Sequence, residues 1–359
     1  MNVTIAGVGG HVPDRIVDNA RLVEAIPGWT AERIVEKTGI LARRYLWDFD
    51  ERTGRTIAPD DIQDPGPTVQ VSEPALLEAL ASAGMQAHEL DGLILTTCTP
   101  DQTNFSHDAM VLHERLGMRP DAFALVHDDG CGGALFHLAM AHELLCAGQR
   151  KTIAIVGVNV ISPLLDREVY SRKLAHAGKE LGAFLTFYLF GDGAGAIILR
   201  AEPSQRSGIR GSFAANEHAD LVVRRAGGNM WPNHPGREQY ADPAFYVDGQ
   251  LVARSFEPLL QRAIDGALAR AEVGLADIER FYLHQANKRV LEAYLDRTGI
   301  PRDRVAMHME RYGNITSAGT LVLLAEDLRE GKVALGSGTL VLMAAIGAGA
   351  QCAAHVIRL

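Results

Sequence analysis

The sequence repeats the same order of predicted elements twice, and this internal repeat constrains the fold more than any other feature. In the first half, a helix-like stretch at 73–84 is followed by an apolar, strand-like run at 89–97. In the second half, the same order appears at 256–273 and 277–285. Apolar runs that alternate with helices are typical of strands covered on both faces of a sheet. The sequence therefore predicts a duplicated α/β fold whose two halves are related by pseudo-symmetry.

The repeat continues to the end of each half. The first half goes on with a helix at 134–147, a strand at 151–157 and a small-residue turn and strand at 191–199; the second with 317–329, 338–343 and 347–357. The segment 201–212 is polar and rich in turn residues, so we place the junction there. We assign residues 1–203 to an N-terminal half and residues 204–359 to a C-terminal half.

Composition sets the broad class of protein. A chain of 359 residues with 47% hydrophobic content can bury a large core, and its net charge of −9 argues against a nucleic-acid binder. The four cysteines lack metal-type spacing and predict reduced thiols (Cys98, Cys131, Cys146 and Cys352). We find neither a signal-peptide pattern nor an apolar run of about 20 residues, and we expect a cytoplasmic protein.

Cys131 is the candidate nucleophile. It lies where an apolar run ends in glycines and a helix-like pattern begins. The N–H groups and the dipole at the start of a helix favour a thiolate. In the repeat, Asn314 occupies the position equivalent to Cys131, and His284 ends a strand beside them. Together these three residues predict an acyl-transfer site.

Each of these residues also has a structural interpretation. A cysteine is often a small buried hydrophobe, and this is the interpretation that we prefer for Cys98, Cys146 and Cys352. The alternative for His284 is a strand-end residue satisfied by hydrogen bonds, but the residues Gln285 to Asn287 beside it disfavour this interpretation. Asn314 is compatible with a cap for the helix that begins near 316, a role that does not exclude catalysis.

Several motifs together carry a family resemblance. They are the glycine-rich start at 7–13, Thr-Gly-Ile at 38–40 with Arg43, Gly-Cys-Gly-Gly at 130–133, the glycine-rich run at 190–196, His-Gln-Ala-Asn at 284–287 and Gly-Asn at 313–314. The chain resembles, nearly end to end, the β-ketoacyl-acyl-carrier-protein synthase III family of thiolase-like condensing enzymes. The resemblance implies a five-layered αβαβα fold with two pseudo-symmetric halves, and a homodimer.

The resemblance also implies a chemistry. Cys131 would be acylated by a coenzyme A or phosphopantetheine thioester, with the backbone N–H groups of Cys131 and Ala348 as the oxyanion hole. A malonyl-type acceptor on acyl carrier protein would then lose CO₂, and His284 and Asn314 would hydrogen-bond the enolate oxygen. Asn287 would orient the site. No cofactor beyond the thioester substrates is expected.

Basic residues are the candidate binding sites for coenzyme A or the acidic carrier protein. Lys288 and Arg289 follow the His-Gln-Ala-Asn motif directly, and Arg33 and Lys37 are further candidates. The alternative for all four is an ordinary solvated helix face.

Three departures from the family pattern bear on substrate. Two acids, Asp128 and Asp129, precede the nucleophile and would raise its pKa unless they point into hydrogen bonds. Arg33 stands where relatives that use coenzyme A carry a tryptophan, which favours a donor carried by a protein. The segment 45–67 is longer than usual and predicts a surface loop. These departures favour a specialised or secondary-metabolic relative over primary fatty-acid initiation.

Other assignments stay open or are discounted. An acyltransferase that acts on a hydroxyl or an amine, a catalytically silent partner subunit and a type III polyketide synthase are the alternative functions, and residues 163–183 are equally compatible with a tunnel wall or the surface. The glycine motifs lack the full dinucleotide-binding context, so we expect no NAD. Five histidines fit no metal spacing, and we expect no metal site (His107, His113, His127, His137 and His142).

Overall fold

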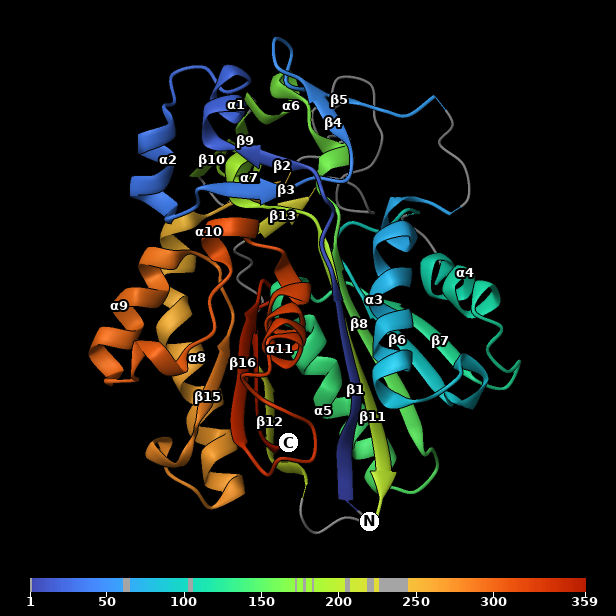
Figure 1. Cartoon of the computed structure of the whole chain (residues 1–359). Coiled ribbons are helices and arrows are strands. Elements are labelled where there is room, and N and C mark those ends of the chain that lie inside the picture. Colours follow the sequence, from blue (N-terminus) through green and yellow to red (C-terminus); the bar gives the residue numbers. More distant parts are fainter. Residues whose placement is uncertain are drawn as a thin grey trace.

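Two mixed β-sheets form the frame of the protein (Figure 1). The computed structural model describes residues 2–60, 65–102, 106–171, 173–176, 179–182, 184–203, 207–217, 223–225 and 245–359. The first sheet has the order β1-β11-β8-β6-β7. Its strands are β1 (Asn2–His11), β11 (Gly193–Glu202), β8 (Thr152–Asn159), β6 (Gly92–Thr96) and β7 (Phe123–His127). β6 runs parallel to both of its neighbours, whereas β11 is antiparallel to β1 and β8.

The second sheet repeats this arrangement with one strand fewer. Its order is β12-β17-β16-β15. The strands are β12 (Gly208–Asn216), β17 (Gln351–Arg358), β16 (Leu340–Gly347) and β15 (Arg280–Leu283). β15 pairs parallel to β16, like the two parallel pairs that β6 makes in the first sheet, and the other pairs are antiparallel. The predicted duplication of elements is confirmed, while the boundary between residues 203 and 204 stays a prediction.

A glycine occupies the equivalent position in each half, so the repeat includes the local geometry of the strands. The register shifts after Ile5 in β1 and after Ile209 in β12, and a glycine follows each shift. A Cβ on Gly7 would lie 2.2 Å from the Ala79 carbonyl oxygen. A Cβ on Gly211 would lie 2.1 Å from the corresponding oxygen of Ala267. Each bulge therefore lets a helix approach its sheet more closely than any side chain would permit.

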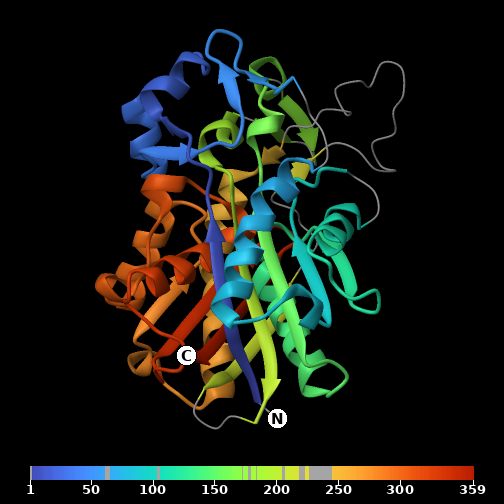
Figure 2. The same ribbon diagram turned by 45° about the vertical axis from the view of Figure 1, so that its right-hand side comes forward.

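Helices form three layers around the two sheets. α5 (Gly133–Cys146) and α11 (Gly319–Arg329) lie between the sheets, and each contacts both of them. α3 (Pro67–Ala83) and α4 (His107–Arg115) pack on the outer side of the first sheet, as Figure 2 shows for α3. α8 (Gly249–Ala271) covers the second sheet, with α9 (Lys288–Thr298) beside it. The five layers α-β-α-β-α confirm the predicted thiolase-like α/β fold.

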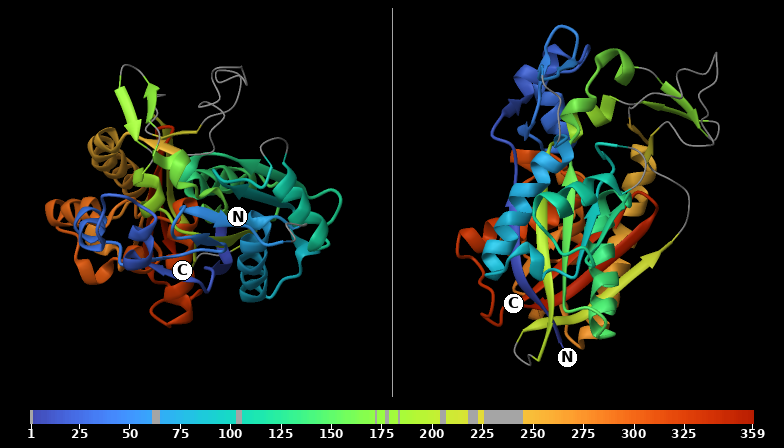
Figure 3. Two further views of the ribbon diagram at one scale, coloured as in Figure 1. Left: turned by 90° about the horizontal axis from the view of Figure 1, so that it is seen from above. Right: turned by 90° about the vertical axis from the view of Figure 1, so that its right-hand side faces the viewer.

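Smaller elements gather beyond one end of the long strands (Figure 3). These are β2 (Ile16–Asp18), α1 (Asn19–Glu24), α2 (Ala31–Thr38), β3 (Ala42–Arg44), β4 (Asp48–Asp50), β5 (Arg55–Ile57), α6 (Arg167–Ser171), β9 (Lys173–His176), β10 (Lys179–Gly182), α7 (Phe184–Leu189), β13 (Val223–Arg225), β14 (Phe245–Val247) and α10 (Met309–Tyr312). Single 3₁₀ turns occur at Ala87–Glu89, Gly130–Gly132, Ser162–Leu164, Leu275–Asp277, Arg302–Arg304 and Thr316–Ala318.

The segment 45–67 differs from the surface loop that we predicted. β4 and β5 pair into a hairpin, and Phe49 in β4 is buried among other aromatic rings. The alternation of polar residues around Phe49 buries one side of the strand, and Gly54 takes a left-handed backbone at the turn, with φ +62°. Residues 61–64 lie outside the described residues.

No helix in the described part of the chain combines the length and the apolar character that a membrane span needs.

Candidate active site

A cavity of about 300 Å³ brings together the three residues predicted to carry the chemistry. Cys131 lies in the 3₁₀ turn that leads into α5, and Asn314 lies just before the 3₁₀ turn that leads into α11. His284 follows the last residue of β15. Cys131, His284 and Asn314 all line the cavity, although more than 150 residues separate the first from the other two. The pseudo-symmetry of the two halves creates this convergence.

The surroundings of the Cys131 thiol favour its neutral form, contrary to our expectation of a thiolate. Burial raises the pKa of Cys131 to about 12, and the charge of Asp128 raises it further. Hydrogen bonds from the Asn314 amide and from the Cys131 backbone N–H act in the opposite direction. The expectation was wrong because the loss of water around the sulfur outweighs the donors at the start of the helix.

Asn314 is held so that its amide nitrogen is free to face the sulfur. Its Oδ1 accepts a hydrogen bond of 2.8 Å from the backbone N–H of Thr316. Its own backbone N–H donates to the carbonyl of Leu189 at 2.9 Å. Since the oxygen end of the amide is occupied, the NH₂ end is the one that bonds to Cys131. The Asn314 side chain thus bonds the first residue of the 3₁₀ turn without being its N-cap, which is Ile315, and it lines the cavity.

His284 is a buried, neutral imidazole. Its backbone N–H donates to the Ala344 carbonyl at 2.8 Å, which continues the parallel pairing of β15 and β16 past the end of β15. Burial lowers the pKa of the His284 side chain to about 4. At neutral pH the ring therefore holds one N–H donor and one acceptor nitrogen, which suits it to hydrogen-bond an oxygen or to accept a proton.

The turn between β16 and β17 packs directly against the nucleophile. A Cβ on Gly132 would lie 2.7 Å from the Gly347 nitrogen, so the two backbones are in close contact. Ala348, the residue predicted to supply an oxyanion N–H, lines the cavity. Gln351 joins the two segments, since its Nε2 donates to the Asp129 carbonyl at 2.7 Å and its Oε1 accepts from the Gly349 N–H at 3.1 Å.

Gln351 is a positioning residue that sequence reasoning missed. It is 5% exposed at the first position of a strand that is buried almost throughout. A buried polar side chain in such a place normally has hydrogen-bond partners. This polar interruption of an apolar run was the available signal.

Asn287 connects two helices at the mouth of the cavity. Its Oδ1 accepts from the Arg289 N–H at 2.8 Å and caps α9, and its Nδ2 donates to the Lys37 carbonyl at 3.0 Å. Both Asn287 and Lys37 line the cavity. The geometry is compatible with the orienting role predicted for Asn287.

The four predicted basic residues differ in whether their side chains bond to other parts of the protein. Lys288 forms an ion pair with Glu310, and Arg289 donates to the carbonyl of Glu36 at 3.3 Å. Arg289 and Lys37 remain exposed near the mouth.

Arg33 is not among the residues that line the cavity. Its guanidinium lies 4.2 Å from the centre of the Trp29 ring, and Trp29 in turn packs against Tyr188 at 4.4 Å. Tyr188 lines the cavity, so an aromatic surface leads to the mouth even though position 33 is not a tryptophan.

The two acids before the nucleophile point in different ways. Oδ2 of Asp129 lies 2.8 Å from Nε2 of His137, while Asp128 is exposed. In the segment 163–183, Tyr170 is buried, and the side chains from 172 to 183 lie outside the described residues.

Comparisons with known proteins agree with this geometry. Two family models match the chain: 3-oxoacyl-[acyl-carrier-protein] synthase III over residues 127–217, and its C-terminal model over residues 268–359. The chain is 30% identical to β-ketoacyl-[acyl-carrier-protein] synthase III of Rhodospirillum centenum, over 99% of this chain and 98% of that protein. The Rhodospirillum rubrum protein of the same name is 31% identical, with the same coverage.

A solved structure shows the same relationship. The β-ketoacyl-[acyl-carrier-protein] synthase III of Thermus thermophilus superimposes with a TM-score of 0.81 over 99% of each chain, at 28% identity. On the motifs, the fold and these relatives together, the chain belongs to the β-ketoacyl-[acyl-carrier-protein] synthase III family of condensing enzymes.

Proposed function

We propose that this condensing enzyme is an acyltransferase that carries its acyl group on Cys131 and uses His284 and Asn314 to form a carbon–carbon bond. The observation that carries the proposal is the convergence of the three side chains on one cavity, with the Asn314 amide bonded to the sulfur. The cavity wall is mainly apolar around them, with residues such as Leu189, Phe190 and Ile346, and suits an acyl chain.

In the first step, the Cys131 sulfur attacks the carbonyl of a thioester. The thiol must lose its proton as the S–C bond forms, and the neutral His284 imidazole is in the form that accepts one. The backbone N–H groups of Cys131 and Ala348 stabilise the tetrahedral oxyanion. The carbon–sulfur bond to coenzyme A or to the carrier then breaks, and that thiolate leaves with the proton.

In the second step, a malonyl group on acyl carrier protein loses CO₂ and becomes an enolate. The neutral His284 ring and the Asn314 amide each donate a hydrogen bond to the enolate oxygen, which requires no metal ion. The enolate carbon attacks the acyl carbonyl on Cys131. The thioester bond breaks, and the Cys131 thiolate takes up a proton from solvent as the 3-oxoacyl product leaves.

Acylation followed by intact-protein mass spectrometry tests this function. We expect an acyl adduct on the wild-type protein that is absent in Cys131→Ala, and release of CO₂ when malonyl-carrier protein is added. Acyl transfer to a hydroxyl or an amine without CO₂ release would establish the alternative acyltransferase. The absence of an adduct with any coenzyme A or carrier thioester would indicate a silent subunit.

The donor is proposed to arrive on a carrier protein. Lys37 and Arg289 present positive charge near the mouth of a chain with net charge −9, and a carrier protein is acidic. We expect faster acylation with acyl-carrier donors than with acyl-coenzyme A. Arg289→Ala is expected to slow acylation by the carrier donor alone. Equal rates with both donors would contradict the preference.

A homodimer is proposed through the outer edge of the first sheet. β7 has a described neighbour on one side only, and Leu125 within it is 39% exposed. Met140 and Leu144 of α5 and Met110 of α4 add further exposed apolar surface. An open strand edge beside apolar side chains is a pairing surface. Sedimentation velocity should show a dimer that Leu125→Lys weakens.

A further inference from the structure

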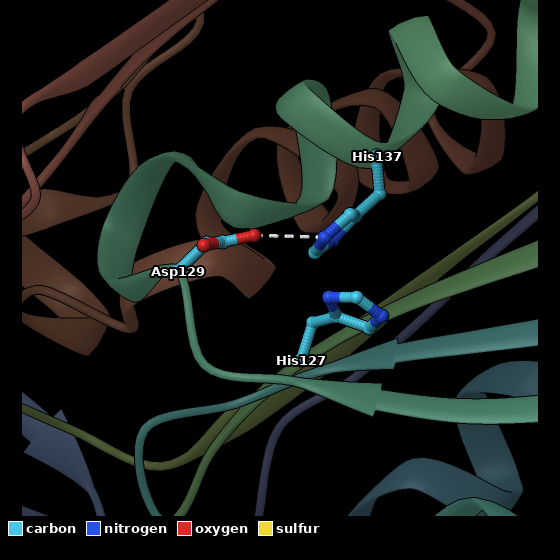
Figure 4. A group of neighbouring side chains, drawn as sticks. All are labelled: His127, Asp129 and His137. Atoms are coloured by element: carbon cyan, nitrogen blue, oxygen red, sulfur yellow. Dashed lines mark ion pairs between the residues drawn. The ribbon is translucent and has the colours of Figure 1, made fainter. Parts of the chain in front are cut away.

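Three potential metal ligands meet beside the active site, outside the cavity (Figure 4). His127 is the last residue of β7, Asp129 follows two residues later, and His137 lies on α5. The ring nitrogens and a carboxylate oxygen of these residues all lie within 4.8 Å of one another. The cluster does not include the Cys131 sulfur. Sequence spacing predicted no metal site here because the contact depends on how α5 packs across the end of β7.

His137 supplies a second, independent observation. Its side chain is 1% exposed, and Nδ1 has no hydrogen-bond partner among the described residues. Nε2 lies 2.8 Å from Oδ2 of Asp129, so these two ligand atoms are already in contact. The His127 ring packs edge-on against it, with 4.7 Å between ring centres. A buried ring nitrogen without a partner is uncommon in folded proteins and requires an explanation.

We propose that His127, Asp129 and His137 form a binding site for a divalent transition-metal ion, with zinc as the preferred occupant. Two imidazoles and one carboxylate are a normal zinc ligand set, with water in the fourth position. Imidazole nitrogen disfavours magnesium and calcium, which prefer oxygen ligands.

The dimensions of the cluster fit such an ion after a small adjustment. Zinc–ligand bonds of about 2.0–2.2 Å in tetrahedral geometry place two ligand atoms of one ion about 3.3–3.6 Å apart. The cluster, at up to 4.8 Å, closes on the ion when side chains rotate to move its ligand atoms by about an ångström. His127 and Asp129 are partly exposed and provide a path for entry.

The position of the site defines its consequence. Asp129 precedes the Gly130–Gly132 turn and His137 follows it, so a bound ion would connect the end of β7 to α5 across the segment that holds Cys131. The ion would cross-link the frame of the nucleophile without contacting the thiol. This inference does not depend on the proposed function of the cavity.

Metal titration of the full-length protein tests the site. The Cys131→Ala variant serves as the parent so that the thiol does not contribute a ligand. After dialysis against a chelator, zinc is titrated by calorimetry and cobalt(II) by visible absorption. We expect one ion per chain. His137→Gln and Asp129→Asn each remove one ligand and should weaken zinc binding at least 10–100-fold. That range is the loss of affinity seen when a residue that only supports a metal ligand is replaced.

A matched control lies on the same helix. His142 is partly exposed and contacts the Cys146 sulfur at 3.5 Å, so His142→Gln removes a histidine that offers a rival surface site. The proposal requires that His142→Gln binds zinc like the parent. It is overturned if the parent binds no ion, if His142→Gln is the variant that loses binding, or if both ligand variants bind normally. A variant that is folded but less stable can still be tested by thermal melting. Zinc should raise the melting temperature of the parent but not that of folded His137→Gln or His127→Gln.

Discussion

Replacing Gly132 with alanine should impair acylation without altering any side chain of the site. The backbone of Gly132 has φ −85° and ψ −8°, which alanine adopts without strain. The added methyl group, however, would lie 2.7 Å from the Gly347 nitrogen and 2.8 Å from the Ile346 carbonyl carbon. Ordinary contacts begin near 3.4 Å, so the backbone at 346–347 must move away by about 0.7 Å.

That displacement determines the size of the effect. The turn that moves carries Ala348, whose N–H we assign to the oxyanion hole. Loss of one such donor costs about 2.7–4 kcal/mol of barrier, or roughly 10²–10³-fold in rate. The expected cost in folding stability is smaller, about 1–3 kcal/mol, as for other overpacked sites. Acylation should therefore fall by about two orders of magnitude in a protein that remains folded.

Rapid-quench mass spectrometry of the acyl-Cys131 adduct measures this rate, with circular dichroism to verify folding. Gly274→Ala is the matched control, because its Cβ would meet nothing closer than Asp277 Oδ2 at 3.5 Å. If Gly132→Ala forms the adduct within about threefold of the wild-type rate, either the turn does not supply an oxyanion donor or it adjusts without loss.

Three further predictions follow from buried polar groups. Asn314→Asp places an acceptor where the amide now donates to the sulfur, so CO₂ release from malonyl-carrier protein should fall by roughly 10²-fold or more; wild-type turnover would contradict the role. Burial lowers the pKa of His284 and of His355 to about 4 from 6.5. The unfolded chain therefore binds more protons than the native protein between these values, and the free energy of unfolding should be flat above pH 6.5 and fall towards pH 4, by about 3 kcal/mol per histidine. Urea unfolding at pH 7.5, 6 and 5 measures this, and a constant free energy would refute it. Arg43→Met removes a fully buried guanidinium that donates to Asn19 Oδ1 at 2.8 Å and to the Tyr188 carbonyl at 2.9 Å. It should lower the free energy of unfolding by about 3 kcal/mol, and an unchanged urea midpoint would show that the acceptors find other donors.

The sequence predicted the frame well because the frame depends on periodic patterns. The helix expected at 134–147 is α5 (Gly133–Cys146), and the strand expected at 338–343 lies largely within β16 (Leu340–Gly347). Buried strands are continuous apolar runs, and glycines mark their turns, so both signals are local. The equivalence of Cys131 and Asn314 followed from the same repeat.

Properties that depend on packing at a distance were not predictable in this way. The raised pKa of Cys131 arises from the removal of water by residues far away in the sequence. The contact between His127 and His137 depends on how a helix crosses the end of an edge strand. The hairpin around Phe49 was interpreted as a loop because charged and turn residues hid its short alternation.

The glycine bulges of β1 and β12 have a consequence for how this site was able to arise. They mark the two halves as copies of one unit, yet the equivalent positions before α5 and α11 now carry different chemical groups, the thiol of Cys131 and the amide of Asn314. In a symmetric pair of separate half-chains, one codon would set both positions, and nucleophile and hydrogen-bond donor would have to be the same residue. Joining the copies in one polypeptide gives each position its own codon. The division of labour in the cavity therefore depends on the two halves being parts of one polypeptide.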